Sequence, residues 1–280
     1  IVFCGDFFQL PPIGMPTEKA RDKFAFMSSA WLEANPAICY LQEQHRQKDN
    51  RLNQILNEIR DRQIGHESKK HLQERLNTPE VAANQAPVLY THNQDVSRTN
   101  NNYLNQLEGK MQLLKAKTKG NKKLLELLKK SVRAPEKIYL KIGAKVMFVK
   151  NNYEMNYVNG SLAEVVNFTA SGAVLVAFED GRKLEVPTET WSIEDEMGKV
   201  LASYSQVPLR LAWAITVHKS QGMTLDSAVI DLSKTFEKGQ GYVALSRLKD
   251  MNGLYLIGIN DKALEVDDLA YKADLSFREL

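Results

Sequence analysis

The hydrophobic pattern of this chain changes its period twice, and this limits the folds that the sequence can adopt. Before residue 140 and after residue 207, apolar residues follow helical spacing or form short runs between polar loops. Between 141 and 206 they alternate with polar residues, and the dipeptides Asn159-Gly160 and Asp180-Gly181 indicate tight turns. The pattern predicts a parallel α/β domain into which a small β-barrel of about four or five strands is inserted.

Shorter patterns predict individual elements. A helix with one apolar face is expected around residues 52–59, and Gly65 suits the left-handed position after it. The run VLYT at 88–91 predicts a buried strand, and Asp95 is placed to cap the following helix. LLELLKK at 124–130 predicts another helix, and LRLAWAITV, AVIDL and GLYLIGI predict strands. The apolar positions are Leu52, Ile55, Leu56 and Ile59 in the first helix and Val96, Tyr103 and Leu107 in the helix after Asp95. In a half-buried strand at 142–148 they are Ile142, Ala144, Val146 and Phe148.

Composition excludes several classes of protein. The chain is 43% apolar and 25% charged, which is ordinary for a globular protein, and no apolar run is long enough to cross a bilayer. Cys4 and Cys39 stand far apart, and the five histidines show no metal-ligand spacing with them. We therefore expect a reducing intracellular setting, the cytoplasm or nucleoid of a bacterium or the nucleus or mitochondrion of a eukaryote, with no membrane partner.

Charge is unevenly distributed along the chain. The net charge is only +3, but Gly109 to Lys150 holds thirteen Lys or Arg against two Glu, so this segment carries +11. A basic surface of this kind can attract phosphates. A solvated helix surface explains such a run equally well.

Two segments carry more polar residues than packing requires. In AWAITVHKSQGMTLD, at 212–226, an apolar strand ends in a cluster of donors. Ligands of α/β sheets bind beyond the carboxyl ends of strands, although a polar loop at this place occurs in any α/β protein. In GQGYVALSRLKD, at 239–250, Arg247 ends a short helix. It can be a solvated partner of the helix dipole or a cation for a transferring phosphoryl group. Trp213 and Tyr242 are expected in the core, and stacking of either ring on a base is the alternative.

The order and wording of four stretches resemble motifs III, IV, V and VI of superfamily 1B helicases, in the Pif1-like branch related to RecD. They are GDFFQLPP, HRQ at 45–47, AITVHKSQGMTLD and GQGYVALSR. The resemblance extends from Gly5 to Leu254. It implies two RecA-like domains of the P-loop NTPase type, 1A and 2A, with an SH3-like barrel, 2B, inserted in 2A. By this division, 1–36 is the tail of 1A, 37–140 the first part of 2A, 141–206 the 2B insertion and 207–280 the rest of 2A.

The resemblance also implies roles for individual residues. Gln9 would sense the γ-phosphate of ATP, although it also fits a turn before the prolines, and Arg46 and Arg247 would reach the same phosphate. For Arg46 the alternative is a cation at a surface helix end. The residues implied at the nucleotide are Gly5, Asp6, Gln9, Arg46, Gln221, Gly222 and Arg247, of which Gln9, Arg46 and Arg247 are catalytic; those implied along the DNA are Thr216, His218, Lys219 and Ser220.

One expected motif is missing. The chain has no G-x-x-x-x-G-K-[ST] stretch to hold the phosphates of ATP, and no second acid follows Asp231 of AVIDL, so that run is expected to be a core strand. The Walker A lysine and the Walker B ligands of Mg²⁺ would lie upstream of Ile1. We therefore expect the C-terminal portion of an ATP-dependent 5′–3′ DNA helicase of repair, recombination or genome maintenance, inactive by itself.

Its expected partners are single-stranded DNA, duplex junctions and RNA–DNA hybrids, and a monomer is expected. Two alternatives stay open at this point. One is a truncated module that binds single-stranded nucleic acid without ATP, and the other is a RecD-type or relaxase-associated helicase subunit.

Overall fold

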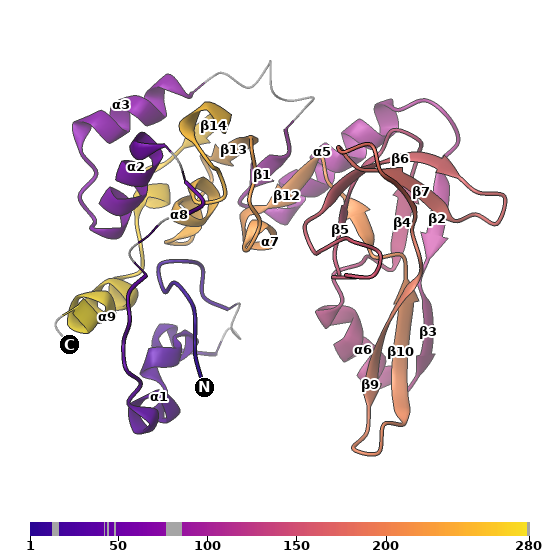
Figure 1. Cartoon of the computed structure of the whole chain (residues 1–280), viewed down its shortest axis with the longest axis horizontal. Coiled ribbons are helices and arrows are strands. Elements are labelled where there is room, and N and C mark those ends of the chain that lie inside the picture. The colour runs from indigo at the N-terminus through magenta and orange to yellow at the C-terminus, as the bar shows by residue number, and fades with distance from the viewer. Residues whose placement is uncertain (13–16, 42, 44, 48, 77–85, 279–280) are drawn as a thin grey trace. The chain divides into compact units, whose positions relative to one another are not determined.

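The computed structural model describes residues 1–12, 17–41, 43, 45–47, 49–76 and 86–278 (Figure 1). Gln44 and Lys48, on either side of the predicted HRQ motif, lie outside the described residues. Residue contacts divide the chain into two compact units. Unit 1 consists of Ile1–Val96 and Ile215–Leu280, and unit 2 consists of Ser97–Ala214.

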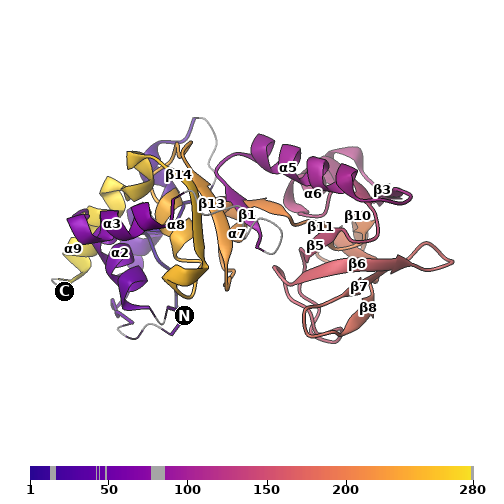
Figure 2. The same cartoon turned by 90° about the horizontal axis from the view of Figure 1, so that it is seen from above.

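Unit 1 is built on a four-stranded sheet with the order β12-β1-β13-β14. β1 pairs in parallel with β13, and β13 in parallel with β14, as the apolar runs predict. Figure 2 shows α2, α3 and α9 on one side of these strands. The elements are η1 (Ala20–Lys23), η2 (Ala25–Met27), α1 (Ser29–Ala34), α2 (Asn50–Arg60), α3 (His66–Glu74), β1 (Val88–Tyr90), β12 (Ala214–Thr216), α7 (Val217–Ser220), β13 (Ala228–Leu232), α8 (Gln240–Leu245), η3 (Met251–Gly253), β14 (Leu254–Ile259), η4 (Asp261–Leu264) and α9 (Asp268–Arg278).

The helix predicted around residues 52–59 is confirmed as α2, whose four predicted apolar residues are all buried. The prediction that Gly65 ends it is wrong. Arg62 takes the left-handed conformation (φ 60°), and the Gln63 amide donates to Glu58 O at 2.9 Å, which closes the helix end. Gly65 has φ −74° and precedes α3 as its N-cap.

The strand at VLYT is confirmed as β1, but the predicted cap is wrong. α5 (Asn93–Gln106) begins before Asp95, which lies inside the first turn. Asp95 Oδ2 forms an ion pair with Lys234 Nζ at 3.2 Å. An acidic residue in a first turn is stabilised there by the helix dipole, so the helix begins three residues earlier than a cap at Asp95 predicts. Leu107 follows the helix, and Leu104 supplies the buried contact instead.

An aromatic cluster connects the N-terminal segment to α9. The Phe7 ring centroid lies 4.9 Å from that of Phe26 and 6.3 Å from that of Phe277, and Trp31 lies 6.2 Å from Phe277. These rings pack mainly edge-on or tilted, the arrangements that aromatic quadrupoles favour. Residues 1–36, predicted to be the tail of domain 1A, therefore lie within unit 1.

Unit 2 is mainly antiparallel. Its sheets have the orders β11-β5-β6-β7-β8, β3-β10-β9 and β2-β4. The core includes Val146, Phe148, Val165 and Val176, each fully buried. The elements are β2 (Gln112–Lys115), β3 (Lys117–Gly120), α6 (Lys122–Ser131), β4 (Lys137–Leu140), β5 (Lys145–Phe148), β6 (Leu162–Phe168), β7 (Val174–Ala177), β8 (Lys183–Glu185), β9 (Glu189–Glu194), β10 (Val200–Gln206) and β11 (Leu209–Leu211).

Most local predictions in unit 2 are confirmed. LLELLKK lies in α6, and Asp180-Gly181 lies in the turn between β7 and β8. Ala144, Val146 and Phe148 are buried, but Ile142 is exposed because it lies in the turn that the Ala144 amide closes by donating to Lys141 O at 3.1 Å. Trp213 is buried and its ring stacks on Tyr103 with centroids 5.7 Å apart.

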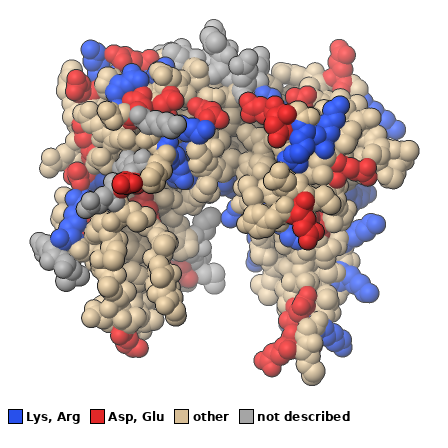
Figure 3. Space-filling model, in the orientation of Figure 1, with Lys and Arg blue, Asp and Glu red and all other residues tan. Residues whose placement is uncertain are grey.

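The contact boundaries at 96/97 and 214/215 differ from the predicted limits of the insertion, 141 and 206, because β2, β3, α6 and β4 belong to unit 2. The assignment to domains 1A, 2A and 2B stays a prediction. The basic segment, Gly109–Lys150, thus lies in unit 2, and ten of its thirteen cations are exposed. Figure 3 shows basic side chains along the β3 edge of unit 2.

Candidate functional site

A pocket of about 340 Å³ lies in unit 1 where three sequence-distant segments meet. The loop after the N-terminal residues, the segment before α2 and the end of α8 all contribute to it. Four predicted site residues are brought together there: Asp6, Gln9, Arg46 and Arg247. The other lining residues are Leu41, His45, Gln47, Leu56, Asn57, Arg60, Tyr242 and Ser246.

Hydrogen bonds within the GDFFQ loop hold Gln9 at the pocket. Asp6 Oδ1 accepts from the Phe8 amide at 3.1 Å, and Asp6 O accepts from the Gln9 amide at 3.2 Å. Phe8 is buried, which anchors the turn. The other oxygen, Asp6 Oδ2, accepts from the Tyr242 hydroxyl at 2.8 Å, so the loop is fixed to α8. Burial, and next the charge of Asp6, raise the pKa of Tyr242, which keeps this hydroxyl a donor.

Arg247 is held at the end of α8 in a buried position, only 1% exposed. Its Nε donates to Val243 O at 2.9 Å and its Nη2 donates to Ser246 Oγ at 2.7 Å. Burial, and next the nearby Arg46, lower the pKa of Arg247 to about 10. The guanidinium therefore remains charged at neutral pH, and an anion in the pocket would offset its repulsion by Arg46.

The segment that carries Arg46 is fixed to the chain after α8. Arg46 Nη1 donates to Ser246 O at 3.1 Å, and Gln47 Nε2 donates to Ser246 O and to Leu248 O at 3.0 and 3.1 Å. Arg46 and Arg247 thus share one wall. Among the described lining residues Asp6 is the one carboxylate, so the pocket suits an anionic ligand.

Arg60 is a lining residue that the sequence reasoning missed. Its guanidinium lies 4.8 Å from the ring centroid of Phe8, a cation–π contact. In the sequence it is only a basic residue in the last turn of a helix, which is typical of a dipole partner. Its position on a pocket wall depends on how α2 packs against the loop, and no local pattern encodes that.

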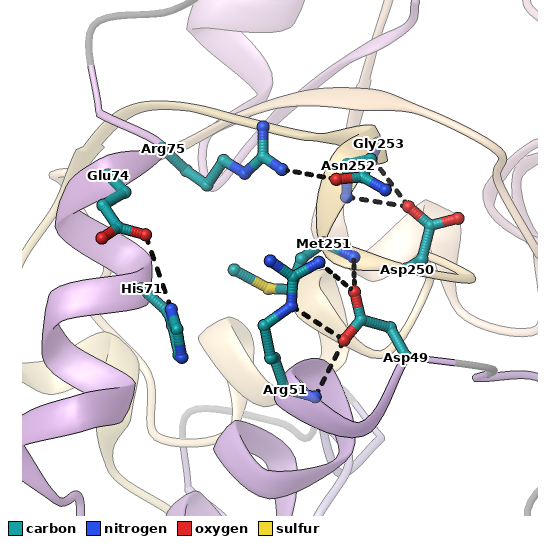
Figure 4. Close-up of polar contacts among 9 residues, drawn as sticks. All are labelled: Asp49, Arg51, His71, Glu74, Arg75, Asp250, Met251, Asn252 and Gly253. Atoms are coloured by element: carbon teal, nitrogen blue, oxygen red, sulfur yellow. Dashed lines mark hydrogen bonds and ion pairs between the residues drawn. The ribbon is translucent and has the colours of Figure 1, made fainter.

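A polar network at the start of α2 holds this helix against η3 (Figure 4). Asp49, the N-cap of α2, accepts from the Arg51 amide and from Arg51 Nη2, both at 2.8 Å. It also accepts from the Met251 amide at 3.2 Å, which connects this helix start to η3. Arg75 of the same region donates to Asn252 at 2.9 Å. The hydrogen bond from Arg51 is the largest cause that lowers the pKa of Asp49 to about 2.

We expect Asp49→Asn to make unit 1 less stable at neutral pH by about 1–2 kcal/mol, since asparagine is also a good N-cap but cannot pair with Arg51. The Asp49 pKa is lowered from 3.8, so its contribution is fully present above pH 4 and is lost as the pH falls toward 2. Thermal unfolding of the unmodified protein and of Asp49→Asn between pH 7 and pH 3 measures the difference in stability. A stability difference that stays constant down to pH 3 would contradict the assignment.

The predicted DNA residues lie elsewhere in unit 1, on the short helix α7 and its cap. Thr216 and Ser220 are buried: Thr216 Oγ1 accepts from the Lys219 amide at 3.3 Å, and Ser220 Oγ donates to Val217 O at 2.7 Å. His218 Nε2 lies 3.3 Å from Glu237 Oε2, and Lys219 Nζ donates to Asn93 Oδ1 at 3.2 Å. The two hydroxyls shape the loop, whereas His218 and Lys219 are partly exposed.

The remaining predicted residues do not line the pocket. Gln221 Nε2 donates to Leu10 O at 3.2 Å, immediately after Gln9, so α7 is connected to the GDFFQ loop. Gly222 follows with φ +83°, a conformation that favours glycine, and Gly5 is exposed.

No group of three or more His, Cys, Asp or Glu residues in the described part of the chain is arranged to hold a metal ion. Within the same residues, no helix has the length and apolar character that a membrane crossing needs.

No protein-family model matches this chain. It is 44% identical to the ATP-dependent DNA helicase Pif1 of Psychrobacter sp. strain PRwf-1, a match that covers 100% of this chain and 51% of that relative. The chain spans about half the length of the curated relatives it matches.

Solved structures show the same likeness. The Pif1 helicase of Candida albicans is 32% identical, with a TM-score of 0.79 over 98% of this chain and 67% of that one. The Bacteroides Pif1 helicase in complex with ADP-AlF3 and single-stranded DNA is 27% identical, with a TM-score of 0.75 over 98% and 66%. Since both sequence and α/β helicase fold agree over nearly the whole chain, the protein belongs to the Pif1 family of DNA helicases.

Proposed function

We propose that the full-length protein is an ATP-dependent DNA helicase that moves 5′ to 3′ on single-stranded DNA in genome maintenance. The observation that carries this proposal is the pocket where Gln9, Arg46 and Arg247 meet. Three helicase-like motifs far apart in sequence supply one cation-rich wall, as a triphosphate site requires. The relatives named ATP-dependent DNA helicase support the same activity.

In this proposal the pocket is one wall of the ATP site. Arg46 and Arg247 stabilise the negative charge that develops on the γ-phosphate, and Gln9 contacts that phosphate from the GDFFQ loop. The proposal assigns the P-loop and the Mg²⁺ ligands to a part of the protein other than this chain. Because Asp6 binds Tyr242 on the helix that precedes Arg247, a shift of the loop on hydrolysis changes the position of both arginines.

The α7 region is proposed to contact DNA. His218 and Lys219 reach the backbone phosphates, and Thr216 and Ser220 hold the loop that presents them. Contacts with backbone phosphates do not depend on the base sequence of the DNA, which suits an enzyme that moves along it. The bond from Gln221 to Leu10 O gives a direct connection between the DNA loop and the γ-phosphate sensor Gln9.

We also propose that the antiparallel part of unit 2 is the SH3-like 2B insertion and that unit 1 is largely domain 2A. The hairpin strands β5 to β8, joined by β11 in one sheet, support this. Single-stranded DNA and forked junctions are the proposed substrates, in line with a solved relative described as unwinding forked duplex DNA. RNA–DNA hybrids as substrates and a monomeric state are further parts of the proposal.

The test uses the full-length protein. We expect ATP hydrolysis that single-stranded DNA stimulates at least about tenfold, and ATP-dependent unwinding of a duplex with a 5′ tail but not a 3′ tail. DNA binding that is indifferent to ATP, without hydrolysis, would instead favour an ATP-independent binding module. Unwinding only within a larger nuclease or relaxase complex would favour a RecD-type subunit.

A further inference from the structure

Two exposed rings lie side by side at the carboxyl end of the parallel sheet in unit 1. The centroids of His92 and Phe236 are 4.8 Å apart with the ring planes tilted by 54°. Phe236 is 50% exposed and His92 is exposed as well. An exposed phenyl ring gains little from the hydrophobic effect, so core packing does not explain the pair.

The topology explains why these two residues meet. His92 follows β1 and Phe236 follows β13, and these strands pair in parallel with Tyr90 opposite Asp231. Adjacent parallel strands end at the same edge of the sheet, where α/β proteins bind their ligands. No motif contains His92, and Phe236 lies three residues before GQGYVALSR begins at Gly239, so the sequence pattern pointed to neither.

The His92 ring is fixed by a buried hydroxyl. Thr91 is 5% exposed, and its Oγ1 donates its one hydrogen to Lys234 O at 3.2 Å. Thr91 Oγ1 also lies 2.8 Å from His92 Nδ1, so the hydroxyl and the ring share a hydrogen bond. This contact orients the ring with Nε2 directed away from Thr91.

The chain around Phe236 is equally well held. The Phe236 amide donates to Gln240 Oε1 at 3.2 Å, and its carbonyl accepts from Lys262 Nζ at 3.2 Å. Asn260 Nδ2 donates to the neighbouring Thr235 O at 2.9 Å. An exposed ring on a backbone fixed from several sides is preorganised for contact with a ligand.

The ring pair adjoins the α7 loop through both of its sequence neighbours. Asn93, next to His92, accepts from Lys219, and Glu237, next to Phe236, pairs with His218. The two rings therefore lie beside the two groups proposed to contact phosphates. A flat exposed π surface beside groups that can donate hydrogen bonds to backbone phosphates is the arrangement that binds nucleotides of a single strand.

We propose that His92 and Phe236 form a base-stacking platform for single-stranded nucleic acid. The proposal rests on the proposed DNA contacts of His218 and Lys219 and adds a site for the base. Any base can stack on it, because every base has a π face, so the platform adds affinity without sequence preference.

The test compares two ligands that carry the same phosphates. Fluorescence anisotropy measures binding of the full-length protein to an oligothymidine strand and to an abasic strand of equal length and charge. The unmodified protein should prefer the strand with bases. Phe236→Ala should weaken binding to oligothymidine roughly 5- to 100-fold and leave the abasic strand within about twofold, whereas Phe236→Trp should retain affinity. His92→Ala should show the same selective loss, but a smaller one.

Tyr40→Ala removes another exposed aromatic ring of unit 1, whose hydroxyl donates to Asp274 Oδ1, and serves as the matched control. It should change neither affinity. The platform would be overturned if Phe236→Ala lost affinity equally for the two strands, or if its affinity for oligothymidine were unchanged. If the unmodified protein binds both strands equally, the platform is refuted while DNA binding stands; if it binds neither, the proposed function falls as well.

Discussion

Arg247→Ala in the full-length protein is expected to lower kcat for ATP hydrolysis about 10³-fold, the effect of removing a cation that stabilises the transferring phosphoryl group. The structure places this guanidinium at the pocket wall with its charge retained, because the pKa is lowered only to about 10. Binding of single-stranded DNA should change less than about threefold, since the Arg247 side chain donates to Val243, Met223 and Ser246 and to no residue of α7. Steady-state hydrolysis and anisotropy measure the two effects.

Two further variants separate chemistry from folding. Arg247→Lys keeps a cation but replaces the planar guanidinium, which donates from Nε and Nη2, with a compact ammonium, so it should recover little hydrolysis. Arg46→Ala, which removes a partly exposed guanidinium from the same wall, should lower kcat with little loss of stability. If Arg247→Ala loses DNA binding and thermal stability in proportion to hydrolysis, its role is structural.

The elements that the sequence predicts well are those whose signal is local. Leu52, Ile55, Leu56 and Ile59 recur at helical spacing and all lie on the buried face of α2. Asp180-Gly181 marks its turn because few residues adopt the conformation that it needs. The misplaced helix limits near Gly65 and Asp95 have the opposite origin. Several residues there can fill a cap or a first turn, and packing decides between them.

The candidate site was predictable as a set of segments but not as a surface. Asp6, Gln9, Arg46 and Arg247 are found from motif wording and meet in one pocket. Arg60 and the ring pair of His92 and Phe236 have no motif of their own, because only the pairing of β1 with β13 and the packing of α2 place them. The sequence also could not show that Thr216 and Ser220 point inward, since a hydroxyl that shapes a loop and one that binds phosphate look alike in a motif.

The glycine between Gln240 and Tyr242 is explained by packing. A Cβ at Gly241 would overlap the backbone carbonyl of Ala263 in η4, where no side chain can move aside. The Asn260 side chain holds that backbone, because Asn260 Oδ1 accepts from the Ala263 amide at 3.1 Å. Gly241 thus sets how closely α8, with Tyr242 and the following Arg247, approaches the rest of unit 1.

Gly241→Ala is therefore expected to destabilise the protein by about 3 kcal/mol, at the upper end for overpacking, and to lower the Tm by roughly 6–12 °C. Hydrolysis should fall as well, because a displaced α8 moves Arg247 away from the pocket. Gly5→Ala is the matched control for stability, since nothing lies within 4 Å of a Cβ at that position and its φ is not positive; its Tm should change by less than about 1 °C. Differential scanning fluorimetry measures both, and an unchanged Tm for Gly241→Ala would show that α8 does not pack against η4 as described.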